Sequence, residues 1–228
     1  MTDESAKTRR IRRADFFSTY LKGRVIDIGC GKDPVLPTAE PYDSIYGHPH
    51  AGKIAEFKPV ESYDCVYSSH CLEHMDNVPD TLRQWWGLVR PGGYLVLVVP
   101  DEELYEQGFW PSRFNPDHKA TFRMGSTGAE SPVSYDLVEL ISQLPQAELV
   151  SAERHTTGYI PWLKWNQGQT IRQKERLMAW LKPLKSFLKN HGLEYSLLGL
   201  CADRLCGFPV DQTLGRALAQ IQIVCRKS

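Results

Sequence analysis

The chain has 228 residues, with 27 Lys and Arg against 27 Asp and Glu and a formal net charge of zero. This length is enough for one large domain with an ordinary core. The charge balance excludes a global attraction to nucleic acid or to an anionic membrane. The longest apolar run, Tyr94–Val99, is far too short to span a bilayer. The first residues, MTDESAKTRRIRR, lack the apolar stretch of a secretory signal, so we expect a cytoplasmic protein with reduced cysteines.

Strands alternate with helices along the chain, which predicts an α/β fold with a parallel sheet covered on both faces. The first half predicts a helix that ends at Gly23 and then four strands, of which the first and the fourth are the clearest. A helix capped by Asp76 or Asn77 follows, and a Pro-Gly-Gly turn separates it from a strong strand signal. The ranges are 11–22 for the first helix, Arg24–Ile28, Ser44–Gly47, Ile54–Phe57 and Tyr63–Ser68 for the four strands, 76–89 for the second helix and Tyr94–Val99 for the last strand.

The second half predicts a helix over Ser134–Leu144 and strands at Ala147–Arg154 and Ala217–Arg226. The gap between these two strands is too long for a turn. Within it, residues 168–190 have helical spacing that is interrupted at Pro183, so we expect two helices of an insert.

The first clear strand runs into a glycine turn. Asp27 lies inside the buried strand end, and Gly29 and Gly31 allow the backbone to turn sharply and to approach a ligand. A dinucleotide fingerprint would have a third glycine where Pro34 stands, and Asp27 would repel a pyrophosphate. An amino-acid-like ligand with a cationic amino group fits better. The alternative is a tight turn that binds nothing.

Two further motifs follow at the expected distance. The fourth strand continues into Ser68-Ser69-His70-Cys71-Leu72-Glu73-His74, and the segment LVRPGGYLVLV introduces the strong strand. Together with the glycine turn, these motifs closely resemble the class I S-adenosylmethionine-dependent methyltransferases over roughly residues 20–105. The resemblance implies a single domain over 1–228 with a Rossmann-like, doubly wound, seven-stranded and mostly parallel sheet. It also implies an antiparallel last strand, with 160–205 as a helical insert or lid before it.

The resemblance also implies where S-adenosylmethionine binds. The turn around its methionine portion would be formed by Asp27, Gly29, Gly31 and the backbone of Cys30, and Ser68, Ser69 and His70 would lie under the sulfonium. Glu56 matches the position that meets the adenine amino group. The family also has an acid at the end of the second strand that holds the ribose hydroxyls, and the matching stretch 45–50 has none. His48, or Asp43 from an irregular loop, would replace it.

A competing motif overlaps this region. Residues 70–74 spell H-x-x-E-H, a zinc metallopeptidase pattern in which two His bind the metal and the Glu acts as base. Such a site needs a long helix and a third ligand, whereas this motif follows a strand. We therefore expect no metal, and we expect Glu73 and His74 to fix the turn through backbone hydrogen bonds.

The long polar stretch after the strong strand is where an acceptor would bind. His118 is the first candidate for a general base and His70 the second, with Asp117 or Glu106 orienting either one. The alternative is that His118 caps a turn and the nearby aromatic side chains pack the loop.

The insert is locally basic, with seven Lys and Arg against Glu175 alone between residues 160 and 190. Trp162, Trp165, Trp180 and Phe187 are interleaved with these charges. Such a stretch could meet an anionic group of the acceptor, rest on membrane lipid in peripheral contact, or form a solvated helix face. No motif supports specific nucleic-acid binding. A smaller basic run, residues 9–13, is expected to be a mobile surface arm.

These features predict a methyltransferase that acts on a small polar acceptor, one that carries an anionic group if the basic insert binds it. A sugar, glycan precursor or related metabolite, methylated on oxygen, is favoured. The alternative from another class is a scaffold that binds the cofactor, has lost turnover and acts through a partner, an option suggested by the missing acid.

Overall fold

The structure, a computed structural model, describes residues 4–43, 61–125, 129, 131–165 and 175–228. Its main sheet has the order β2-β1-β3-β4-β8-β7. The first four of these strands are mutually parallel, and β8 is antiparallel to both β4 and β7. The strands are β1 (Val25–Ile28), β2 (Glu40–Tyr42), β3 (Tyr63–Ser69), β4 (Val89–Pro100), β7 (Ala147–His155) and β8 (Gln220–Lys227).

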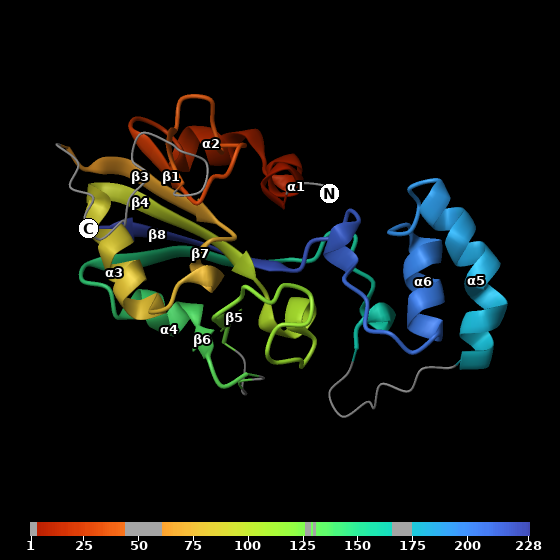
Figure 1. Cartoon of the computed structure of the whole chain (residues 1–228). Helices are drawn as coiled ribbons and strands as arrows, with labels where there is room; N and C mark the ends of the chain where they lie inside the picture. The colour runs from red at the N-terminus through yellow and green to blue at the C-terminus, as the bar shows by residue number, and fades with distance from the viewer. Residues whose placement is uncertain (1–3, 44–60, 126–128, 130, 166–174) are drawn as a thin grey trace.

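Two layers of helices cover the sheet (Figure 1). Side chains alternate between its faces because successive residues of a strand point to opposite sides. On one face, Ile26 and Leu95 pack with helices α3 (Val78–Leu88) and α4 (Leu137–Ser142). On the other, the buried Val25 packs toward α2 (Ala14–Tyr20).

The N-terminal helix α1 (Glu4–Ile11) crosses the edge where the parallel strands end. Lys7 is buried and donates from Nζ to the carbonyls of Thr213, at 2.6 Å, and Ala217, at 3.2 Å. Arg9 pairs with Asp33 on the glycine-turn loop.

Arg12 donates to Gln222 Oε1 of β8 from both Nε and Nη2, and its guanidinium lies 5.0 Å from the centre of the Tyr67 ring. The side chains of Arg9 and Arg12 are therefore held in place by contacts with the rest of the domain. The expectation of a mobile basic arm over residues 9–13 is wrong at these two positions.

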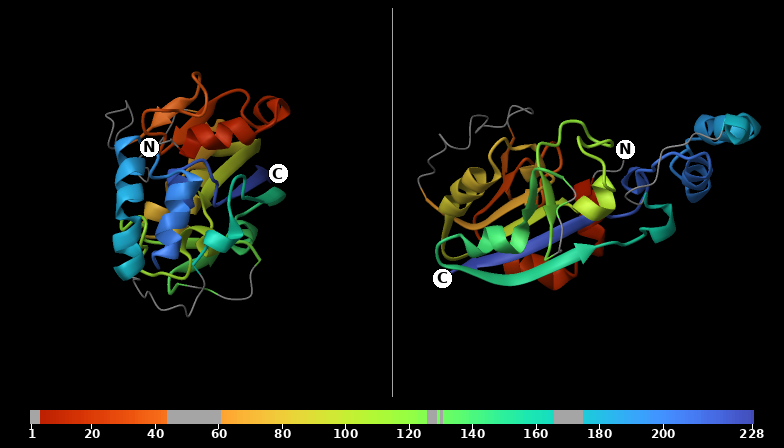
Figure 2. Two further views of the ribbon diagram at one scale, coloured as in Figure 1. Left: turned by 90° about the vertical axis from the view of Figure 1, so that its right-hand side faces the viewer. Right: turned by 90° about the horizontal axis from the view of Figure 1, so that it is seen from below.

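The insert lies beyond the carboxyl ends of the parallel strands, apart from the sheet (Figure 2). It contains the short turn η4 (Pro161–Leu163) and the helices α5 (Glu175–Asn190) and α6 (Leu197–Leu205), which pack through Leu181 and Ala202. Helix α5 continues through Pro183, where the sequence predicts a break. Residues 175–190 therefore form one helix where the sequence predicts two, and the second helix of this region, α6, begins only at Leu197.

Most predicted elements are confirmed, and two shift. The strand beside β1 is Glu40–Tyr42, earlier than the predicted Ser44–Gly47, a range that lies outside the described residues together with Ile54–Phe57. The predicted helix over 134–144 begins as β6 (Ser134–Asp136), and the Asp136 carboxylate then caps α4.

Of the seven strands expected in the sheet, six are found among the described residues. A separate parallel pair is formed by β5 (Thr121–Arg123) and β6. The Rossmann-like α/β architecture and the antiparallel last strand are confirmed. No helix within the described ranges is long and apolar enough to cross a membrane.

Candidate functional site

The glycine turn lies at the carboxyl end of β1, next to the ends of β2 and β3. Gly29 has φ +76°, its N–H donates to the carbonyl of Tyr42 at 2.7 Å, and a Cβ built on it would lie 2.5 Å from Cys71 Sγ. Gly29 is thus required both by the left-handed backbone and by the close approach of Cys71.

The buried side chain of Asp27 forms a hydrogen bond to the backbone of the loop that follows the turn. Its Oδ2 accepts a hydrogen bond from the N–H of Val35 at 2.6 Å, and the residue is 2% exposed. Burial raises the pKa of Asp27 to about 7, although the hydrogen bond from Val35 and the charge of Arg12 act against it. A carboxyl with this pKa changes its charge near neutral pH.

An acidic residue lies at the end of the second strand. Asp43 follows β2 directly, and its Oδ2 accepts a hydrogen bond from the N–H of Gly31 at 3.0 Å. Asp43, one of the two replacements that the sequence offers for the acid, therefore lies at the end of the strand beside β1, because that strand ends at Tyr42. His48, the other replacement, and Glu56 lie outside the described residues.

The other predicted turn residues are buried at the same edge. Ser68 Oγ donates to the carbonyl of Ile28 at 2.9 Å and so joins the ends of β3 and β1. The hydroxyl of Ser69 is buried at the end of β3. Burial raises the pKa of Cys30 to about 11, so its thiol stays protonated.

His70 has φ +52° and is held by the protein on both sides of its ring. Its Nε2 lies 3.1 Å from Gln220 Oε1, and its Nδ1 lies 3.5 Å from Glu73 Oε1. The Gln220 amide also bonds to Thr8 of α1 at 2.9 Å and to His155 of β7 at 3.1 Å. Sequence reasoning missed Gln220, because nothing near it in the chain marks it as polar and buried.

His118 is buried beside Glu106, and its Nδ1 lies 2.7 Å from Glu106 Oε1. The prediction that Glu106 could orient His118 agrees with this geometry. Asp117, the other predicted partner, instead offers its carbonyl to Nδ1 of His74, at 3.1 Å. The carbonyl of Glu73 accepts hydrogen bonds from the N–H groups of Lys119, at 2.7 Å, and Ala120.

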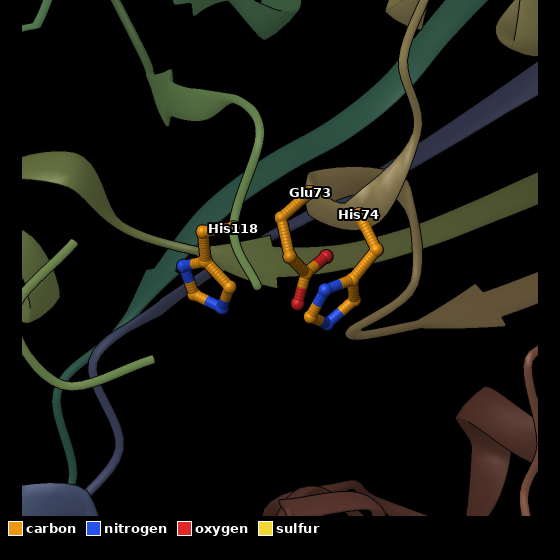
Figure 3. Close-up of side chains that lie close together, drawn as sticks. All are labelled: Glu73, His74 and His118. Atoms are coloured by element: carbon orange, nitrogen blue, oxygen red, sulfur yellow. The ribbon is translucent and has the colours of Figure 1, made fainter. Parts of the chain in front are cut away.

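Glu73, His74 and His118 converge, with one ligand-type atom of each lying within 4.8 Å of the others. Figure 3 shows the Glu73 carboxylate between the two imidazole rings. Burial acts to raise the pKa of Glu73, but the imidazoles of His70, His118 and His74 outweigh it and hold this pKa below its ordinary value. The H-x-x-E-H motif itself lies in a single turn, η2 (Leu72–His74), and not in a long helix.

Residues 5–126 match a family described as a methyltransferase domain. Among solved structures, the chain is 14% identical to a coclaurine N-methyltransferase bound to N-methylheliamine and S-adenosylhomocysteine, covering 99% of this chain and 75% of that one with a TM-score of 0.48. It is 15% identical to a plantazolicin methyltransferase, covering 98% and 84% with a TM-score of 0.49. It is 11% identical to phosphoethanolamine N-methyltransferase 2 of Haemonchus contortus, covering 97% and 51% with a TM-score of 0.49. No curated protein sequence gives a match.

Replacing Gly29 tests the geometry of the turn. Gly29→Ala is expected to lower the free energy of unfolding by ~2 kcal/mol or more, because it combines backbone strain with a collision against Cys71. The control is Gly87→Ala in α3, where a Cβ meets nothing within 4 Å, and which should be neutral or stabilising. Urea denaturation measures both, and equal stabilities for the two variants would contradict the assignment.

The raised pKa of Asp27 predicts a pH dependence of stability. Folding favours the protonated form, so this contribution is complete below pH ~4 and is lost as the pH rises through about 7. Asp27→Asn keeps an oxygen for the N–H of Val35 but does not ionise. Between pH 5 and 8, the Tm of the cofactor-free wild type should fall relative to that of the variant by about 5 °C. If the Tm of the wild type and that of Asp27→Asn change equally with pH, the prediction is wrong.

Proposed function

Because this chain belongs to the S-adenosylmethionine-dependent methyltransferase domain family, we propose that it methylates a hydroxyl of a small polar acceptor at the carboxyl edge of β1, β3 and β4. The observation that carries the proposal is the cluster of His118, Glu106, Glu73 and His74, two of which lie in the turn that follows β3. The cofactor of the family is S-adenosylmethionine.

The described residues of the turn suit the parts of this cofactor. Gly29 and Gly31 let the backbone approach the methionine portion, with Asp27 behind them, as the sequence predicts. Asp43 is the acid for the ribose hydroxyls, a role that we now assign to it instead of His48. The buried hydroxyl of Ser69, at the end of β3, is a further group proposed to contact the cofactor.

The reaction is an in-line displacement, so alignment and exclusion of water are the main tasks of the protein. The acceptor oxygen attacks the methyl carbon, and the carbon–sulfur bond breaks with its electron pair remaining on sulfur. The products are a methyl ether, S-adenosylhomocysteine and one proton. An amine with a free lone pair needs no group to receive a proton before attack, whereas a hydroxyl gains from one.

The histidine and carboxylate cluster therefore favours an oxygen acceptor. Glu106 bonds to Nδ1 of His118 and so leaves Nε2 as the nitrogen that can accept a proton, on a ring that lies close to Glu73 and His74. His70 is better suited to positioning than to base catalysis, because Gln220 and Glu73 occupy the two sides of its ring. A sugar, glycan precursor or similar metabolite supplies such hydroxyls.

The insert is proposed to bound the acceptor side as a lid. Lys164 Nζ lies 2.6 Å from Glu103 Oε1, and the N–H of Trp165 donates to Gln107 Oε1 at 2.8 Å. These contacts join the base of the insert to the loop after β4. With Asp43 in the proposed role, the scaffold alternative loses its main support, which was a missing acid.

Titration with S-adenosylmethionine tests the cofactor assignment. Asp43→Asn should weaken binding about tenfold or more, because a carboxylate hydrogen bond to a ligand hydroxyl contributes ~1.5–3 kcal/mol. Asp15→Asn, at an exposed position of α2, is the control and should bind like the wild type. Equal affinities for Asp43→Asn and the wild type would remove Asp43 from the site.

The acceptor is identified by incubating the protein with methyl-labelled cofactor and a polar metabolite extract. We expect label in a hydroxyl-bearing compound as an ether. Label found only on nitrogen would overturn the choice of oxygen, and cofactor binding without labelled product across the extract would favour the scaffold.

Helix α5 is also proposed to make peripheral contact with anionic lipid. Trp180 and Phe187, two turns apart, are 75% and 54% exposed on one side of α5, and Arg176 lies one turn before Trp180. Exposed aromatic side chains beside positive charge suit the interface of an anionic membrane. Lys185, by contrast, is paired with Asp203 within the insert.

Co-sedimentation with phosphatidylserine vesicles across a salt series measures this contact. The double variant Trp180→Ser/Phe187→Ser should bind ~10-fold more weakly than the wild type. The control Leu149→Ser/Val150→Ser removes two apolar side chains of β7, each 41% exposed. This control should bind the vesicles as tightly as the wild type. Absence of wild-type binding at low salt would contradict the lipid contact.

A further inference from the structure

Two histidines of the cluster are held in the form that leaves Nε2 free to bind an ion. Nδ1 of His74 faces the carbonyl of Asp117, which can only accept a hydrogen bond, so Nδ1 carries the proton. Nδ1 of His118 faces the Glu106 carboxylate at 2.7 Å, and the same argument applies. Metal-binding histidines in proteins are typically oriented by such partners, a carboxylate or a backbone carbonyl on the far nitrogen.

The third member, Glu73, is 1% exposed, and the partner recorded for its carboxylate within the described residues is His70, whose Nδ1 lies 3.5 Å from Oε1. An ionised carboxylate with so few partners is costly to bury. The only cationic group recorded at ion-pair distance in the described part of the chain is the His70 imidazole, at 3.5 Å, and only when it is protonated. The carboxylate lies between the His74 and His118 rings (Figure 3).

We propose that Glu73, His74 and His118 bind one divalent transition-metal cation. Two imidazole nitrogens and one carboxylate oxygen form a set that suits zinc and its neighbours, whereas magnesium and calcium prefer oxygen ligands. Ligand atoms at ~2.1 Å from a shared ion lie at most ~4.2 Å apart, so the observed separation of up to 4.8 Å requires a small inward movement. His74 is partly exposed and gives the ion a path from solvent.

This ligand set differs from the zinc-peptidase pattern in the sequence. That pattern pairs residues 70 and 74 on one helix, whereas His70 here turns toward Gln220 and its place is taken by His118 from a distant loop. The backbone positions His118, since the carbonyl of Glu73 accepts hydrogen bonds from the N–H groups of Lys119 and Ala120. The same backbone contact at Glu73 therefore holds the loop in place and brings His118 next to Glu73 and His74.

The role of the ion rests on the proposed function, although its binding does not. With three protein ligands, the ion keeps positions open for a hydroxyl of the acceptor and lowers the pKa of that hydroxyl. The proton then passes to solvent, the oxygen attacks the methyl carbon, and sulfur keeps the electron pair of the broken bond. In this form of the mechanism, His118 is a ligand and not a free base.

The test is titration of the full chain, freed of metal with a chelator and kept reduced, with Zn²⁺ by calorimetry and with Co²⁺ by visible absorption. We expect one ion per chain and weak binding of Mg²⁺. His74→Ala and Glu73→Gln should each weaken Zn²⁺ binding ~100-fold, and Glu106→Gln, which acts through His118, should weaken it ~10-fold. His191→Ala, at an exposed histidine after α5, is the control and should bind like the wild type.

Circular dichroism and thermal unfolding without metal show whether each variant folds. Because His74 is partly exposed, His74→Ala should fold, and it keeps the test decisive if Glu73→Gln does not. Absence of a wild-type ion, or equal affinities for His74→Ala and the wild type, would overturn the metal site. S-adenosylmethionine binding is measured separately, in the presence of chelator. If the protein binds the cofactor but no metal, only the metal site is overturned. If it binds metal but not the cofactor, the proposed function is overturned and the metal site stands.

Discussion

The main-chain carbonyl of Glu73 is the contact on which the arrangement of the candidate site depends. It accepts hydrogen bonds from the N–H groups of Lys119 and Ala120, and so returns the long loop after β4 to the end of β3. The same residue buries its carboxylate between two imidazoles. One residue therefore fixes the loop with its backbone and supplies charge to the site with its side chain. A substitution that keeps the backbone in place can separate these two roles.

Hydrogen bonds between buried polar groups join several elements at the carboxyl edge of the sheet. The amide of Gln220 bonds to Thr8 of α1, His70 after β3 and His155 of β7. The buried amine of Lys7 adds contacts to the carbonyls of Thr213 and Ala217. Buried polar groups with few alternative partners specify one arrangement, because each lost hydrogen bond leaves a costly unpaired atom. The N-terminal helix is thus part of the site's wall.

The sequence predicted the elements whose signals are local. The glycine turn and strands β3 and β4 follow from buried runs bounded by turn residues, and the family resemblance extended them to a cofactor site. Strand β2 was misplaced because its three residues, Glu40–Tyr42, include a proline and carry no apolar alternation. The sequence offered Glu106 and Asp117 as alternative partners of His118, and the structure pairs it with Glu106. The sequence did not predict that His118 approaches Glu73, because the two residues are 45 positions apart and meet only through the fold of the intervening loop. The continuity of α5 through Pro183 reflects tertiary packing that outweighs local preference.

The antiparallel position of β8 has a consequence for biosynthesis. Gln220–Lys227 lies between β4 and β7, although both of those strands precede it in the sequence. During translation, the apolar β4 therefore leaves the ribosome with one edge unpaired and must wait until Gln220–Lys227 has followed. Exposed edges of apolar strands are prone to pair with other chains. The nascent protein therefore exposes an aggregation-prone strand edge until β8 has been synthesised.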